Sequence, residues 1–198
     1  MKYDFKLKVA DSENELQEIY KFRYRIYVEE MQRRQNDANH ICKTVRDQLD
    51  DWGRNFFVTH GDRIVGVVRG NFFRDGYDSK YEEMYSPEVA GIDHPTTTCM
   101  VTRLMIDPKF RGTSLVLEIF LWLYDYALNH ELKWIFLDCN ESLIPFFQKF
   151  GFCEYRGKVE HAEYGLVTPM RIQLMDHQHL KQVASPYLSL LDTHLSRK

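Results

Sequence analysis

The stretch from Cys99 to Ser114, CMVTRLMIDPKFRGTS, constrains the fold of this chain most. An apolar strand runs directly into Asp107-Pro108 and Arg111-Gly112, and an apolar helix is predicted to begin near Thr113. A helix start leaves backbone N–H groups without intrahelical partners, and these groups together with the helix dipole can hold a phosphate. Gly112 has no side chain to keep such a ligand away from the backbone. The stretch therefore predicts an anion site between a strand and a helix.

The rest of the chain places strands and helices around this turn in a defined order. After an initial strand, Ser12 and Glu15 have the spacing of a helix start, and the helix is predicted to run through LQEIYKFRYRIYVEEM. Two apolar runs flank His60-Gly61-Asp62 and predict an antiparallel hairpin. Residues 32–48 and 74–98 are predicted loops, followed later by a strand over 133–139, a helix ending at Phe150 and a last hairpin. We find no repeat or linker and expect one α/β domain over residues 1–198.

Composition narrows the class of protein. With 198 residues, of which 44% are hydrophobic and 14% aromatic, the chain can bury a substantial core. A net charge of −3 argues against bulk binding of nucleic acid. The most apolar run, LVLEIFLWLYDYAL, is shorter than the roughly 20 residues that span a bilayer. The cysteines form no CxxC pair and the first residues lack a signal-peptide core, so we expect a cytoplasmic protein.

A second segment, NESLIPFFQKFGF over residues 140–152, follows the apolar strand LKWIFLDC. Together with the turn at Gly112 it resembles the GNAT acyltransferase fold, in which a mixed central sheet with two splayed parallel strands is flanked by helices. Four further pieces, FRYRIYVEEM, GVVRGN, VTRLMID and HAEYGLVTPMRIQL, occur in this order. As an ordered set they resemble the long-chain N-acyl amino acid synthases of the FeeM type, relatives of the acyl-homoserine-lactone synthases. The resemblance extends from Tyr20 to Leu174.

The resemblance implies transfer of a long-chain acyl group from an acyl carrier protein thioester to the α-amine of an amino acid. Such a reaction needs positioning, a hydrogen-bond donor for the oxyanion and an acceptor for the amine's proton. In GNAT proteins a backbone N–H of the central strand meets the thioester carbonyl, which here points to Leu104, Met105 and Ile106. The implied contacts to the phosphopantetheine arm, or to coenzyme A, are Ile106, Lys109, Arg111, Gly112, Thr113, Ser114 and Asn140. Lys109 and Ser114 differ from the usual first and last residues of the phosphate signature.

Two departures from the relatives bear on the chemistry. Phe147 stands where many acetyltransferases have a tyrosine that protonates the departing thiolate, so we assign Phe147 to substrate binding only. Met100 stands where the lactone-forming relatives have an acidic residue, although Arg103 is retained. We therefore expect simple amide formation instead of lactone formation from S-adenosylmethionine.

Four arginines fall inside the matched motifs: Arg23, Arg25, Arg69 and Arg103. One interpretation is an ion-pair network that orders the loop over the site, with Glu29, Glu30, Asp50 and Asp51 as partners. The other is substrate binding, because arginine holds a carboxylate in bidentate fashion. The candidate substrate-binding residues are Arg23, Asp51, Arg69, Arg103 and Phe147. Both interpretations stay open at this point.

The proton acceptor is not decided by the sequence. Glu29, Asp51 and His94 are the candidates, and the pKa range of histidine suits a general base near neutral pH. His177 and His179 have no third ligand at a useful spacing, so no metal site is predicted.

The sequence leaves two alternatives to the synthase. A coenzyme-A-dependent N-acetyltransferase would favour a shorter pocket and a fuller phosphate loop. A GNAT protein that binds acyl carrier or lipid without turnover is supported by Phe147.

For the synthase we expect a large apolar or aromatic acceptor, tyrosine first. Because acyl carrier proteins are acidic, a local basic surface is expected at Lys109, Arg111 and Lys149, with Arg33 and Arg34 as further members.

Overall fold

The structure is a computed structural model that describes residues 3–197. The chain groups into two compact units. Unit 1 comprises residues 1–71 and 101–119, and unit 2 comprises residues 72–100 and 120–198. The single domain expected from the sequence stays a prediction.

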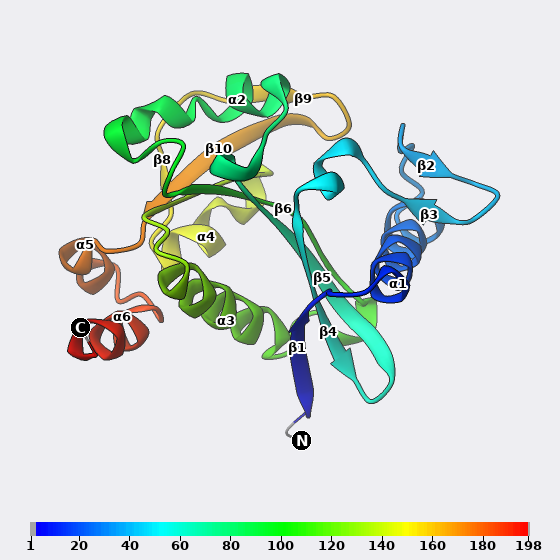
Figure 1. Cartoon of the computed structure of the whole chain (residues 1–198), viewed down its shortest axis with the longest axis horizontal. Helices are drawn as coiled ribbons and strands as arrows, with labels where there is room; N and C mark the ends of the chain where they lie inside the picture. The colour runs from blue at the N-terminus through cyan, green and yellow to red at the C-terminus, as the bar shows by residue number, and fades with distance from the viewer. Residues whose placement is uncertain (1–2, 198) are drawn as a thin grey trace. The chain divides into compact units, whose positions relative to one another are not determined.

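A mostly antiparallel sheet of eight strands has the order β1-β4-β5-β6-β7-β10-β8, with β9 paired to β10 (Figure 1). Strand β6 (Thr98–Ile106) contributes residues to both units. Its first residues pair in parallel with β7 (Trp134–Cys139), with Thr98 opposite Trp134 and Met100 opposite Phe136. The mixed sheet with flanking helices confirms the predicted fold class.

In unit 1, strand β1 (Phe5–Val9) pairs antiparallel with β4 (Arg54–His60), and β4 forms the predicted hairpin with β5 (Arg63–Phe72). Helix α1 (Glu13–Tyr24) continues as a π-helix over Arg25–Glu30. The Ser12 side chain accepts a hydrogen bond from the Glu15 N–H, which confirms the predicted helix start. Apolar side chains of α1, β4 and β5 form the core of this unit, among them Ile19, Phe22, Phe57 and Val67.

The predicted loop over residues 32–48 holds a small hairpin of β2 (Ala38–Asn39) and β3 (Thr44–Val45). Its turn is closed by the Asn39 side chain, whose oxygen accepts hydrogen bonds from the N–H groups of Ile41 and Cys42. Strand β3 contacts α1. A 3₁₀ helix follows over Gln48–Asp51. The two-residue strands are too short to show periodicity, which is why the sequence did not predict them.

Helix α3 (Leu115–Asn129) begins shortly after Thr113, where the sequence placed it, and follows a 3₁₀ helix over Pro108–Phe110. The Thr113 hydroxyl accepts the N–H of Leu115 at 3.3 Å. Only the first turn of α3 belongs to unit 1. A Cβ built on Gly66 of β5 would lie 3.3 Å from Ile119, so a residue without a side chain lets the strand and this turn approach closely.

In unit 2, β10 (Gly165–Gln173) pairs antiparallel with β7, β8 (Cys153–Glu154) and β9 (Val159–His161). A 3₁₀ helix over Glu141–Leu143 leads into α4 (Ile144–Phe150), which packs on the ring of Phe120. Helices α5 (His177–Gln182) and α6 (Leu188–Ser196) follow the sheet. No helix within residues 3–197 combines the length and the apolar character needed to cross a membrane.

The predicted loop over residues 74–98 contains helix α2 (Ser79–Tyr85), 3₁₀ helices over Phe73–Asp75 and Pro87–Asp93, and the start of β6. Asp78 caps α2 by accepting the N–H of Lys80 at 2.8 Å. The Tyr85 hydroxyl donates to the Asp138 carboxylate at 2.5 Å, which ties α2 to β7. This segment was predicted as a loop because its helical turns are short and lie among proline, glycine and aspartate residues.

Candidate active site

A buried group of charged side chains in unit 1 forms the arginine network, which consists of Arg23, Arg69, Arg103, Asp47 and Asp50. Arg23 donates from Nη1 to the two oxygens of Asp50 at 3.0 and 2.8 Å. Arg69 donates from Nη1 to Asp47 at 2.5 Å and lies 3.1 Å from Asp50. Arg103 donates to the other Asp47 oxygen from Nε at 3.2 Å and from Nη2 at 2.6 Å. The side chains of Arg23, Arg69 and Asp50 have no exposed area.

Local structure positions the two carboxylates. Asp47 is the N-cap of the 3₁₀ helix over Gln48–Asp51, and its side chain accepts the N–H of Leu49 at 2.9 Å. Asp50 returns a hydrogen bond by accepting the Asp47 N–H at 3.1 Å. This reciprocal capping box helps to hold both carboxylates in position through backbone N–H groups of their own segment.

The arginines come from three separate elements. Arg23 lies on α1, Arg69 on β5 and Arg103 on β6. Arg103 has a φ of +58°, a left-handed conformation that is uncommon for a residue with a side chain. Backbone strain of this kind inside a strand persists only where surrounding contacts hold it. Here Asp47 and the Gln35 side-chain oxygen, which accepts Arg103 Nη1 at 2.9 Å, provide such contacts.

The network has one more positive than negative charge. Burial by itself would raise the pKa of the Asp47 carboxyl, but Arg69 and Arg103 outweigh it and hold that pKa well below its usual range. Burial would raise the pKa of Asp50 as well, and Arg23 and Arg69 together lower it. Both carboxylates are therefore ionised against three guanidinium groups. Within the described residues, Arg69 Nη2 is buried without a hydrogen-bond partner.

The structure brings three of the four arginines together and places the fourth, Arg25, elsewhere. Arg25 pairs with Asp107 at 3.0 Å, outside the network. The expected acidic partners Glu29, Glu30 and Asp51 instead pair with Lys43, Arg111 and Arg46, all at exposed positions. Of the expected partners only Asp50 belongs to the network. Asp47 was missed, although the Asp-x-x-Asp spacing in RDQLDD has the pattern of a capping box and could have indicated it.

The turn over residues 107–114, named the phosphate turn, joins β6 to α3 in unit 1. Gly112 has a φ of +78°, and a Cβ built on it meets no atom within 4 Å, so this side of the turn is open. Arg111 donates from Nε to the Ile106 carbonyl at 3.0 Å and pairs with Glu30. Thr113 donates its hydroxyl to the Phe110 carbonyl at 2.7 Å. Ser114 donates its hydroxyl to Glu118 at 2.8 Å.

The predicted oxyanion donors lie at the end of β6, directly before this turn. Met105 and Ile106 are buried, and Leu104 is half-buried. The next residue, Asp107, donates its N–H to the Val65 carbonyl of β5 at 2.9 Å. Asp107 also caps the turn by accepting the Lys109 N–H at 3.0 Å. Lys109 is exposed.

His94, Asn140 and Phe147 belong to unit 2. His94 Nδ1 lies 3.0 Å from the Thr98 hydroxyl, which also lies 3.3 Å from the Pro95 carbonyl. In the tautomer whose Nδ1 donates to Thr98, Nε2 carries the lone pair. Burial lowers the pKa of His94, against the raising effect of Glu82 and Glu88, so the imidazole is neutral at neutral pH.

The other two unit 2 candidates differ in burial. Asn140 is exposed, and its side chain does not cap the 3₁₀ helix that follows. Phe147 is buried and its ring packs against Phe120, Phe146 and Phe152. These contacts pack Phe147 on α4 against its neighbours, and its role in substrate binding stays a prediction.

No group of three or more His, Cys, Asp or Glu side chains within residues 3–197 is arranged to hold a metal ion. His177 Nε2 lies 2.9 Å from Asp192, and His179 Nε2 lies 3.0 Å from the Gly151 carbonyl. These two histidines connect helices α5 and α6 to their surroundings.

The mixed sheet with a strand–turn–helix unit at Gly112 defines an acyltransferase fold of the GNAT type. The family described as N-acyl amino acid synthase FeeM matches residues 18–173. This chain belongs to that family and is an N-acyltransferase, which confirms the resemblance seen in its motifs. A comparison with curated proteins gives no match.

Solved structures with the same fold include an N-acyl amino acid synthase and acyl-homoserine-lactone synthases. FeeM, an N-acyl amino acid synthase from uncultured soil microbes, superposes with a TM-score of 0.71 at 11% identity and covers 96% of this chain and 99% of its own. The acyl-homoserine-lactone synthase LasI has a TM-score of 0.68 at 16% identity, over 87% and 91%. The coenzyme-A-dependent acyl-homoserine-lactone synthase BjaI has a TM-score of 0.64 at 17% identity, over 88% and 84%.

Proposed function

We propose that this protein transfers a long-chain acyl group from an acyl carrier protein thioester to the α-amine of an amino acid. The observation that carries the proposal is the match of the N-acyl amino acid synthase family over residues 18–173. In the reaction the amine attacks the thioester carbonyl, the new C–N bond forms and the C–S bond breaks. The amine loses a proton and the carrier leaves as a thiolate, which is then protonated.

The phosphate turn fits the phosphate of a pantetheine arm. Gly112 is open on its outer side, and Lys109 adds an exposed ammonium group that forms no ion pair within residues 3–197. Both features favour an anion at the start of α3. Arg111 is held by Glu30 and the Ile106 carbonyl, so we assign it to shaping the turn. The N–H groups of Leu104, Met105 and Ile106 remain the proposed oxyanion donors, and Asn140 a proposed donor contact.

We propose that the arginine network attracts the carboxylate of the acceptor amino acid. Arg69 and Arg103 do not form a free clamp, because both are bonded to Asp47. The network nevertheless places three guanidinium groups in a largely buried setting, where electrostatic attraction to a carboxylate is stronger than in water. A large apolar or aromatic acceptor is proposed, with tyrosine first, because the chain is rich in aromatic residues.

His94 is the proposed proton acceptor. In the tautomer whose Nδ1 donates to Thr98, its neutral imidazole has Nε2 available to accept a proton, whereas Glu29 and Asp51 are exposed carboxylates in surface ion pairs. We expect His94→Gln to lower kcat by at least about 100-fold, as loss of a general base does, while Glu29→Gln has little effect. In the wild type, the acid limb of the kcat profile should lie below the usual histidine pKa of 6.5, since only the neutral form accepts a proton. An unchanged kcat in a folded His94→Gln variant would exclude this role.

Mass spectrometry of reaction mixtures tests the function directly. The purified protein is given myristoyl acyl carrier protein, myristoyl-coenzyme A or acetyl-coenzyme A with a mixture of amino acids. The proposal predicts N-myristoyl amino acids and free thiol from the carrier thioester. A preference for the coenzyme A thioester, the kind of donor on which the synthase BjaI depends, would replace acyl carrier protein as the proposed donor. A lysine or glutamate head group would exclude the aromatic acceptor, and absence of any free thiol would identify a binding protein without turnover.

A further inference from the structure

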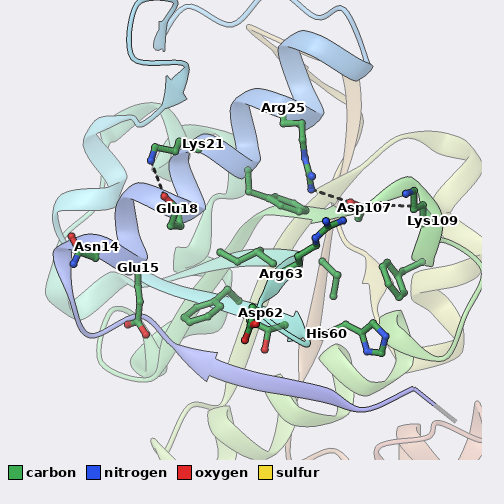
Figure 2. A pocket seen from close by; sticks show the side chains of 16 residues that line it. Asn14, Glu15, Glu18, Lys21, Arg25, His60, Asp62, Arg63, Asp107 and Lys109 are labelled. Carbon is green, nitrogen blue, oxygen red and sulfur yellow. Dashed lines mark hydrogen bonds and ion pairs between the residues drawn. The ribbon is translucent and has the colours of Figure 1, made fainter.

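An open groove of about 780 Å³ runs along one side of α1 in unit 1 (Figure 2). On the α1 side it is lined by Asn14, Glu18, Lys21 and Arg25, which recur every three or four residues and so form one stripe of the helix. The opposite wall is provided by β4, β5 and the phosphate turn. Asp107, Lys109 and Phe110 belong to both the turn and the groove.

The charges of the groove are arranged unevenly. Towards the start of α1, Glu15 pairs with Lys8 and Glu18 pairs with Lys21. At the other end Asp107 is paired with Arg25, while Arg63 and Lys109 form no ion pair within residues 3–197. Figure 2 shows the Arg63 side chain pointing toward the Arg25–Asp107 pair. The end that adjoins the phosphate turn is therefore cationic, with Asp62 as the only lining carboxylate of the described residues that lacks an ion-pair partner.

The shape and the floor of the groove narrow the choice of ligand. Its apolar floor includes Phe22, Phe57 and Val65, which are 4%, 7% and 3% exposed, while Ile64 and Phe110 are half-buried at its edge. Its length follows α1, whose 12 residues extend over roughly 18 Å at 1.5 Å per residue. An elongated, shallow groove with one cationic end suits an acidic α-helix better than a buried acyl chain.

We propose that this groove docks an acidic helix of the acyl carrier protein, with Arg63 and Lys109 facing its carboxylates. The inference rests on the proposed function, because it assumes that the donor is held by a carrier protein. The shared residues of groove and turn place the docked helix beside the point where the pantetheine phosphate is bound. Of the basic surface expected from the sequence, only Lys109 lines this groove, and Arg25 and Arg63 are new members.

Charge reversals in opposite directions at two neighbouring positions, Arg63 and Asp62, test the proposal. Arg63→Glu should raise the KM for myristoyl acyl carrier protein about tenfold and flatten its salt dependence. Asp62→Lys should lower that KM, a gain that damage to the fold would not produce. Both positions are exposed, and both variants should leave kcat and the KM for myristoyl-pantetheine within about twofold, because that small donor makes no contact with the groove. Lys181→Glu, an exposed charge reversal on α5, is the matched control and should change neither KM.

The possible outcomes test the docking surface and the proposed function separately. Equal changes with both donors, or no change with the carrier in either variant, would overturn the docking proposal. No turnover of the wild type with either donor would contradict the proposed function instead. In that case fluorescence anisotropy of labelled holo acyl carrier protein still decides the docking surface. A weaker affinity for Arg63→Glu and a stronger one for Asp62→Lys support it, and equal affinities of all variants overturn it.

Discussion

Arg23 and Arg25 lie two residues apart on the same helical segment and have different surroundings. Two positions along an α-helix correspond to a rotation of about 200°, so the two side chains leave on opposite sides. Arg23 enters the arginine network with no exposed side-chain area, and Arg25 reaches Asp107 at the groove with 49% of its side chain exposed. The same segment thus supplies one cation to a buried network and a second cation to an open surface.

The difference in burial decides what each cation can do. In the network, charges removed from water must be paired, because an unpaired buried charge costs several kcal/mol. The network therefore holds α1, β5, β6 and the 3₁₀ helix over Gln48–Asp51 in one arrangement. At the groove, each charge is hydrated in the free protein and its pairing contributes little to stability. Such charges remain available to a partner, so we expect mutations in the network to affect folding and mutations at the groove to affect recognition.

Asp47→Asn should give the largest effect on stability. The substitution removes the carboxylate that Arg69 and Arg103 share and leaves two buried guanidinium groups without it. We expect the free energy of unfolding in urea to fall by about 3–5 kcal/mol. Asp51→Asn is the matched control, since its carboxylate pairs with Arg46 at the surface and should contribute less than about 1 kcal/mol. Similar losses in the two variants would contradict the proposed contrast between buried and exposed pairs.

The second largest effect is expected in the loss of stability at acidic pH. The pKa values of Asp47 and Asp50 are lowered in the folded protein, so their stabilising contribution is complete above the unfolded value of about 3.9. It is lost as the pH falls through the lower, folded values, at about 1.4 kcal/mol for each unit of lowering. In urea unfolding between pH 7 and pH 3, the free energy of unfolding should change little through these groups above pH 5 and decline below about pH 4. Asp47→Asn should decline less, and an equal decline would mean that other carboxylates are responsible.

The sequence predicted the fold and much of the phosphate turn, because both depend on local patterns. Two apolar runs on either side of Gly61 indicated the hairpin, and the Asp107-Pro108 and Arg111-Gly112 pairs marked the turn before α3. The ion pairs could not be predicted in the same way. Asp47 and Arg103 are far apart in the chain and meet only after β6 and the 3₁₀ helix are in place, so no local spacing indicates their contact. The groove depends likewise on Arg25 and Arg63 from separate elements.

Gly112→Glu should act on donor binding with a moderate effect. The new carboxylate would stand beside the proposed phosphate position, and the backbone there has a φ of +78°. We expect the KM for the acyl donor to rise at least about tenfold, with roughly 1 kcal/mol of lost stability from the left-handed backbone. Gly165→Glu is the control, because Gly165 has a φ of +70° and is also open to solvent but lies on β10. A folded Gly112→Glu variant with unchanged donor affinity would show that the phosphate binds elsewhere.

Arg25→Gln should have the smallest effect on stability and sharpens the comparison within the segment. Arg25 and Asp107 pair where 49% of the arginine side chain is exposed, so water and salt screen the attraction. We expect a loss below about 1 kcal/mol at low ionic strength, and a smaller loss in about 0.5 M salt. Arg23→Gln, only two positions away, should lose several kcal/mol, because Asp50 would keep a buried charge with one partner fewer. Urea titrations of both variants at two salt concentrations measure the difference. If Arg25→Gln were as destabilising as Arg23→Gln, the Arg25–Asp107 pair would be needed for folding. The charges of the groove could then not be assigned to partner binding separately from stability.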